Sequence, residues 1–80
     1  MARILIIEDN PANVELMAFL LTAFGHVALS APDGARGIAL ARAEPPDLVA
    51  CDVNLPDMNG FAVLGALKAE PALAGVPVLA

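Results

Sequence analysis

The stretch CDVNLPDMNG, residues 51–60, ends an apolar run with a carboxylate, Asp52, and then continues into turn-forming residues. The stretch ILIIEDN, residues 4–10, has the same arrangement near the N-terminus, where Glu8 and Asp9 follow four apolar residues. Carboxylates are rarely buried without a partner. Two apolar runs that both end in acids therefore predict a polar edge where two buried strands stop.

The rest of the chain alternates between apolar, strand-like runs and helix signals. Asn10 is a good helix N-cap, Pro11 fits the first helical position, and Gly25 supplies the left-handed residue that ends a helix. Pro45 and Pro46 end a second helix. We predict strands over residues 3–7, 26–30, 47–51 and 76–80, and helices over residues 10–24, 32–44 and 61–70.

This alternation predicts an α/β fold with a parallel sheet, because a strand, a helix and a strand at this spacing form a crossover unit. No internal repeat or linker divides the 80 residues, so we expect one domain. Ligands of such sheets bind outside the carboxyl ends of the strands, where the strand order reverses. Glu8, Asp9 and Asp52 all lie at such ends.

The composition excludes several classes of protein. A chain with 59% apolar residues has ample core material and is not disordered. Its net charge of −5 argues against direct binding of nucleic acid or an anionic membrane, and favours metal cations and basic partner surfaces. The N-terminal apolar run is too short for a signal peptide or a membrane span. The single cysteine, Cys51, is expected to be a small buried residue, and its lack of a disulfide partner indicates a cytoplasmic protein.

The three acids form a candidate metal site if the first and third strands are neighbours. Like charges this close repel one another unless a cation lies between them. An all-oxygen site favours Mg²⁺, which binds one or two carboxylates together with phosphate oxygens, and aspartate is a known covalent phosphoryl acceptor. A plainer interpretation remains open, in which Asp9 or Asn10 only caps a helix and Asp52 only begins a turn.

Four stretches, ILIIEDN, PDGARGIAL, PDLVACDVNLPDMNGF and VPVLA, resemble the receiver domain of bacterial two-component response regulators. The stretch EDNPAN is most similar to stand-alone receivers of the cell-cycle type or to those attached to hybrid kinases. The resemblance implies a flavodoxin-like (CheY-like) fold with three α/β/α layers and a parallel sheet in the order 2-1-3-4. It also implies that Asp52 is the phosphoacceptor for a sensor histidine kinase or a histidine phosphotransfer protein.

The same resemblance assigns the metal ligands. Asp9 and Asp52 would bind Mg²⁺ directly, and Glu8 would hold it through a water molecule. Asn54 would offer its backbone carbonyl oxygen as a further ligand. Pro56 would help to shape the loop after the phosphoacceptor, together with Gly60.

The chain departs from the family pattern at its end. Receivers complete the site with a Thr or Ser just past strand four and a Lys at the end of strand five, and neither falls within a chain that ends at Ala80. The fourth helix, fifth strand and fifth helix are missing too. We therefore expect residues 1–80 to be the N-terminal two-thirds of a receiver, truncated before the fifth strand. Any homodimer would then form through surfaces missing from this chain.

The first helix carries two sets of apolar residues. Val14, Ala18 and Phe19 are expected on its outer side, where a phenylalanine is unusual, and they are our candidate docking face for the helical bundle that bears the donor histidine. The other side is expected to face the core, with the residues Asn13, Leu16, Met17, Leu20, Leu21 and Phe24 at helical spacing.

Two other functions remain as alternatives to the phosphoacceptor. A scaffold module that kept the fold but lost phosphorylation would have no need of three close carboxylates. An aspartate-nucleophile phosphatase would have a second acid two residues after the nucleophile, where this chain has Asn54. We therefore expect a signalling domain and not an enzyme.

Overall fold

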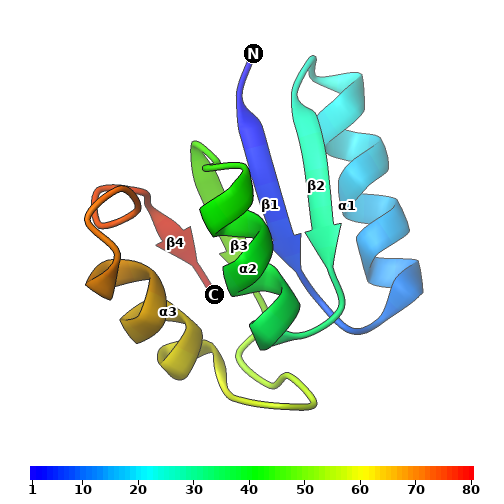
Figure 1. The fold of residues 1–80 in the computed structure, drawn as a ribbon. Helices are drawn as coiled ribbons and strands as arrows, with labels where there is room; N and C mark the ends of the chain where they lie inside the picture. Colours follow the sequence, from blue (N-terminus) through cyan, green and yellow to red (C-terminus); the bar gives the residue numbers. More distant parts are fainter.

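A computed structural model describes all 80 residues of the chain, and its strands and helices alternate along the sequence (Figure 1). All seven predicted elements are present, and their ends differ from the predicted ones by at most two residues. The strands are β1 (Arg3–Ile7), β2 (Val27–Ala31), β3 (Leu48–Cys51) and β4 (Val78–Leu79), and the helices are α1 (Pro11–Ala23), α2 (Gly34–Ala43) and α3 (Gly60–Ala69).

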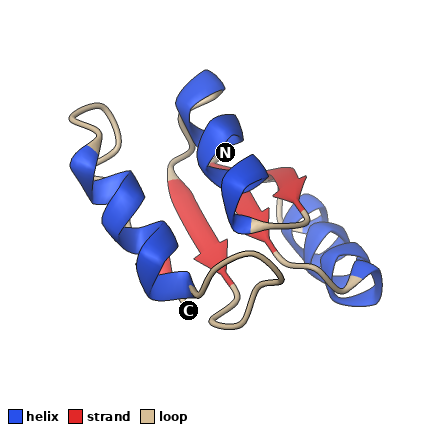
Figure 2. Ribbon diagram, turned by 60° about the horizontal axis from the view of Figure 1, so that its bottom comes forward, coloured by secondary structure: helices blue, strands red, loops and turns tan.

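The strands form one parallel sheet in the order β2-β1-β3-β4. Helices α2 and α3 cover one face of the sheet, and α1 lies on the other face (Figures 1 and 2). The predicted three-layer α/β/α fold and the predicted strand order are therefore confirmed. Because β1 and β3 are neighbours, their carboxyl ends lie side by side.

Strand β1 is the centre of the hydrophobic core. It pairs with β2 on one side and β3 on the other, and its residues Ile4 to Ile7 are all buried. A strand covered on both faces needs apolar side chains at every position, which accounts for its continuous apolar run. Each fully buried aliphatic side chain contributes about 1.5–3 kcal/mol to stability, so β1 fixes the position of the acids that follow it.

Helix α2 lies unusually close to β1. A Cβ atom at Gly37 would lie 2.5 Å from Cδ1 of Ile7, the last residue of the strand. A side chain at this position would therefore push the helix away from the strand just before the acids begin.

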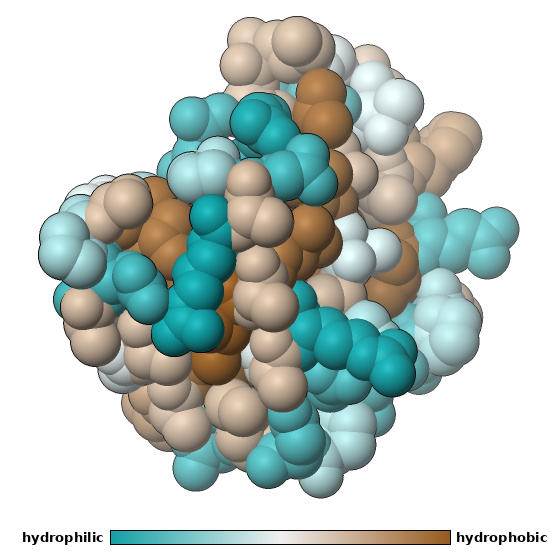
Figure 3. Space-filling model, in the orientation of Figure 1, coloured by the Kyte–Doolittle hydropathy of each residue, from teal (hydrophilic) through white to brown (hydrophobic).

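The outer surface of the layer formed by α2 and α3 is mixed in polarity, and strongly hydrophobic atoms show mainly in the seams between elements (Figure 3).

The two ends of α1 are formed as the sequence predicts. The side chain of Asn10 accepts hydrogen bonds from the backbone N–H groups of Ala12, at 2.9 Å, and Asn13, at 3.4 Å. At the other end Gly25 has a φ of +83°, and the next N–H, that of His26, donates to the carbonyl oxygen of Leu21. This is the Schellman arrangement, in which a left-handed glycine ends the helix.

The predicted core stripe of α1 is wrong in part. Leu16, Leu20 and Phe24 are exposed, because α1 packs against β2 with a different face. The helix is apolar nearly all the way round, so the sequence pattern offered two candidate faces. The half-buried face consists of Val14, Met17, Ala18 and Leu21.

None of the three helices combines the length and the apolar character that crossing a membrane would require.

Candidate functional site

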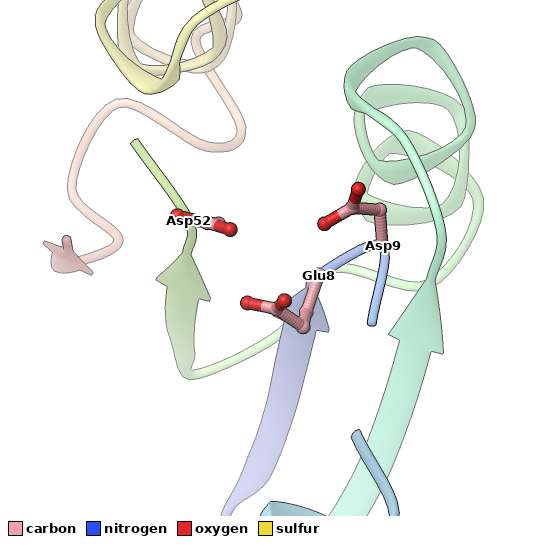
Figure 4. Close-up of side chains that lie close together, drawn as sticks. All are labelled: Glu8, Asp9 and Asp52. Atoms are coloured by element: carbon pink, nitrogen blue, oxygen red, sulfur yellow. The ribbon is translucent and has the colours of Figure 1, made fainter. Parts of the chain in front are cut away.

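Three carboxylates meet at the carboxyl ends of β1 and β3 (Figure 4). The register pairs Ile7 with Cys51, so the residues that follow them, Glu8 and Asp52, leave the sheet together. The backbone N–H of Asp52 donates to the carbonyl oxygen of Ile7 at 2.9 Å, which holds the two strand ends against each other. One carboxylate oxygen from each of Glu8, Asp9 and Asp52 lies within 4.8 Å of the others.

Backbone and amide groups hold two of these acids in place. Oε1 of Glu8 accepts a hydrogen bond from the backbone N–H of Asn10 at 3.2 Å and a longer one from Nδ2 of Asn13 at 3.4 Å. Oδ1 of Asp52 accepts a hydrogen bond from the backbone N–H of Asn54 at 3.3 Å. The other oxygen of each side chain accepts no hydrogen bond, so both acids keep a free acceptor for a ligand. Figure 4 shows the three carboxylates pointing into the space between the two strand ends.

This cluster fits a magnesium ion. Mg²⁺ binds oxygen ligands at about 2.1 Å, so the oxygens of its octahedral shell are at most about 4.2 Å apart. The three carboxylate oxygens lie within 4.8 Å of one another, which is close to this limit. The donor set contains no nitrogen or sulfur, which favours Mg²⁺ over zinc.

The backbone carbonyl of Asn54 is available as a further ligand. It accepts no hydrogen bond in the structure, although its residue lies in a compact loop. Asn54 forms an isolated antiparallel β-bridge with Asn59. A backbone hydrogen bond lies on each side of this bridge: the N–H of Gly60 donates to the carbonyl oxygen of Val53, and the N–H of Leu55 donates to that of Met58. The loop between β3 and α3 is therefore folded back on itself beside the acids.

Gly60 lets this loop close against the phosphoacceptor candidate. A Cβ atom at Gly60 would lie 2.9 Å from the backbone oxygen of Asp52 and 3.2 Å from Cα of Val53. We expect Gly60→Ala to lower the free energy of unfolding by about 1–3 kcal/mol, because backbone atoms cannot move aside as a side chain can. Urea denaturation measures this change.

Gly65 is the matched control for that substitution. It lies in the same helix, α3, and a Cβ atom there would meet nothing within 4 Å. Gly65→Ala should raise stability by up to about 1 kcal/mol, because alanine is the better helix former. Equal stability of the two alanine variants would show that the loop does not need a glycine at residue 60.

Cys51 lies between the core and the acids. It is buried, as the sequence predicted. Burial raises the pKa of its thiol above the ordinary value, and the nearby charges of Asp52 and Glu8 raise it further. The thiol therefore stays protonated and unreactive at neutral pH.

Sequence reasoning missed the role of two loop residues. Asn59 was expected only in a turn, but its side chain caps α3 by accepting from the N–H of Ala62 at 2.9 Å. Asp57 was also expected only in a turn, but its carboxylate binds the first turn of α2. The Asn59 cap had a local signal, because a cap residue directly precedes an apolar helix. The Asp57 contact had none, since its partners lie 22 and 23 residues away.

The fold and the cluster of acids define a class of protein. Residues 4–80 match the family described as the response regulator receiver domain. The chain belongs to this family, the receivers of two-component signalling. It is similar to protein PilH of Pseudomonas aeruginosa, with 39% identity over 79 residues that cover 99% of this chain and 65% of that protein. It is also similar to the polar-differentiation response regulator DivK of Brucella anthropi, with 35% identity over 96% of this chain and 63% of that protein.

Solved structures support the same assignment. The chemotaxis response regulator CheY4 of Vibrio cholerae superimposes with a TM-score of 0.95 at 27% identity, over 98% of this chain and 65% of that one. The receiver domain of the sensor histidine kinase PA1611 from Pseudomonas aeruginosa has a TM-score of 0.91 at 26% identity, over 96% of this chain and 63% of that one. That structure has a magnesium ion coordinated in its active site cleft. The chain spans just under two thirds of the length of PilH and DivK.

Proposed function

We propose that Asp52 accepts a phosphoryl group from a phosphohistidine in a Mg²⁺-dependent reaction, and that its phosphorylation state switches the binding of a partner. The observation that carries this proposal is the convergence of the Glu8, Asp9 and Asp52 carboxylates within 4.8 Å at the ends of two neighbouring strands. Three close carboxylates repel one another and do not stabilise a fold. Their arrangement is accounted for by a cation and an incoming phosphoryl group.

The chain's own residues supply the acceptor and its position. The free carboxylate oxygen of Asp52 forms the new bond to phosphorus, while the bond between phosphorus and the donor imidazole nitrogen breaks and its electron pair returns to the imidazole. The N–H of Asn54 holds the other oxygen of Asp52, so that only one oxygen is presented to the donor. Asp9 and Asp52 would bind the magnesium ion directly, Glu8 would hold it through a water molecule, and the backbone carbonyl of Asn54 would be a further ligand. Bound Mg²⁺ would neutralise the charge that develops on the phosphoryl oxygens.

The direct test is phosphorylation of the full-length protein by a small phosphodonor with and without Mg²⁺. We expect one acid-labile phosphate per chain in the presence of Mg²⁺ and none after chelation. A protein that binds Mg²⁺ but takes up no phosphate from the donor or a kinase would be a scaffold instead. Turnover of a phosphate ester would indicate a phosphatase.

Receivers interact with histidine kinases, and we propose that α1 carries part of the contact in this protein. Phe19 lies on its outer side with 69% of its surface exposed, beside the exposed residues Ala12 and Leu16. Val14 and Ala18, which the sequence placed on the same side, are half-buried on the face of α1 that contains Met17. The docking face is therefore best represented by Phe19 and its exposed neighbours.

Substitution of Phe19 by glutamate tests this docking face. We expect Phe19→Glu to slow phosphotransfer from the cognate kinase by about tenfold or more, because a charge would replace a desolvated aromatic contact. Phosphorylation by the small phosphodonor should not change. The control is Phe61→Glu, because Phe61 is equally exposed, at 74%, but lies on α3. Equal rates for the two glutamate variants with the kinase would contradict the assignment.

A further inference from the structure

The loop between β3 and α3 is attached to the beginning of α2 by one side chain. Oδ1 of Asp57 accepts a hydrogen bond from the N–H of Gly34, and Oδ2 accepts one from the N–H of Ala35, both at 2.9 Å. The helix also has its own cap, since Asp33 accepts from the N–H of Arg36 at 2.8 Å. Asp57 is therefore an additional partner that comes from a different part of the chain.

Packing reinforces this attachment. A Cβ atom at Gly34 would lie 2.5 Å from Cγ and 2.6 Å from Sδ of Met58, so the Met58 side chain rests directly on the helix and would have to move if residue 34 had a side chain. The hydrogen bonds from Gly34 and Ala35 hold the pKa of Asp57 below its ordinary value. The contact thus favours the charged carboxylate, as expected for an acid at a helix N-terminus. Figure 1 shows the loop passing beneath the first turn of α2.

The attachment point is connected to the metal ligands through the loop backbone. The N–H of Leu55 donates to the carbonyl oxygen of Met58 at 3.2 Å, and Asn54 bridges to Asn59. A movement of Asp57 away from α2 would therefore shift the carbonyl of Asn54. The same movement would disturb the N–H of Asn54 that holds Asp52.

We infer that Asp57 is a positioning residue for the magnesium site: by binding the first turn of α2, its carboxylate fixes the loop that places the carbonyl of Asn54 beside Asp52. This inference rests on the function proposed above and adds a residue that touches neither the metal nor the phosphoryl group. Its effect is on the geometry of the ligands, so it should appear in Mg²⁺ affinity.

The test compares Asp57→Ala with Asp33→Ala in the full-length protein. Both substitutions remove a carboxylate that caps α2, but only the first frees the loop. Mg²⁺ affinity is measured by calorimetry and by the Mg²⁺ concentration that gives half-maximal labelling from a small phosphodonor. We expect Asp57→Ala to weaken Mg²⁺ binding about tenfold and Asp33→Ala to leave it unchanged, since residues that orient metal ligands typically contribute at least this much. Labelling at saturating Mg²⁺ should largely recover.

A conservative variant separates positioning from loss of fold. Asp57→Asn keeps one acceptor oxygen for α2, so its Mg²⁺ affinity should fall between those of the wild type and Asp57→Ala, with the circular dichroism spectrum of the wild type. Equal Mg²⁺ affinity for wild type and Asp57→Ala, or equal losses for Asp57→Ala and Asp33→Ala, would overturn the inference while the proposed function stands. A wild-type protein that neither binds Mg²⁺ nor takes up phosphate would overturn both.

Discussion

Asp52→Asn is expected to abolish phosphorylation while the fold stays intact. The amide has the same shape as the carboxylate, and its oxygen can still accept the N–H of Asn54 that holds Asp52 at 3.3 Å. A neutral amide oxygen is a much poorer nucleophile than a carboxylate and cannot form a stable phosphoryl adduct. The expected loss of label is therefore complete. Mass spectrometry and acid lability of the phosphate measure it.

Asp47→Asn is the matched control for this experiment. Asp47 precedes the same strand, β3, but lies at its opposite end, where it accepts a hydrogen bond from the N–H of Arg3 at 2.7 Å. The amide can keep that bond, and label uptake should equal that of the wild type. Undiminished labelling of Asp52→Asn would place the acceptor on another residue and remove the main support for the proposed function.

Asp9→Asn is expected to change two properties in opposite directions. Without Mg²⁺ it should stabilise the fold by up to about 1 kcal/mol, because it removes one of three partly exposed charges that repel one another. With Mg²⁺ it should weaken metal binding by about 100-fold, because Asp9 is the proposed direct ligand. Wild-type protein should gain about 2.7 kcal/mol of stability at a Mg²⁺ concentration 100 times its Kd, and the variant should gain only about 0.4 kcal/mol at that concentration.

Urea denaturation in chelator and in Mg²⁺ measures both effects. Glu15→Gln is the control, since Glu15 is an exposed acid in α1 outside the cluster and its loss removes the same charge. This variant should respond to Mg²⁺ like the wild type. If Asp9→Asn gained as much stability from Mg²⁺ as the wild type, the carboxylate of Asp9 could not be a metal ligand.

The sequence predicted the order of the elements because it depends on strong local patterns, whereas the neighbouring of the two acid-tipped strands was implied by the resemblance to receivers. The apolar run of β1 is buried on both faces, and a strand of that kind has few other places in an α/β fold. Asn10 and Gly25 specified the two ends of α1 through local backbone geometry. Once β1 and β3 are neighbours, their terminal carboxylates must lie together.

The orientation of α1 and the role of Asp57 could not be predicted in the same way. Helix α1 has an apolar residue at almost every position, so its sequence pattern does not identify one buried face. Leu16 and Met17 were therefore equally good candidates for the core. The structure exposes Leu16 and half-buries Met17. The contact of Asp57 with Gly34 depends on the path of a loop over a distant helix, and no local pattern reports such a contact.

The pairing of β1 with β3 also makes the proposed phosphorylation site dependent on the completion of folding. Asp9 and Asp52 lie far apart along the chain, and α1, β2, α2 and β3 come between them in sequence. In newly synthesised or denatured molecules these acids are not held together, so under the proposed function such molecules would bind no ion and offer a kinase no acceptor. Under the proposed function, only molecules that have closed this long loop could take up phosphate.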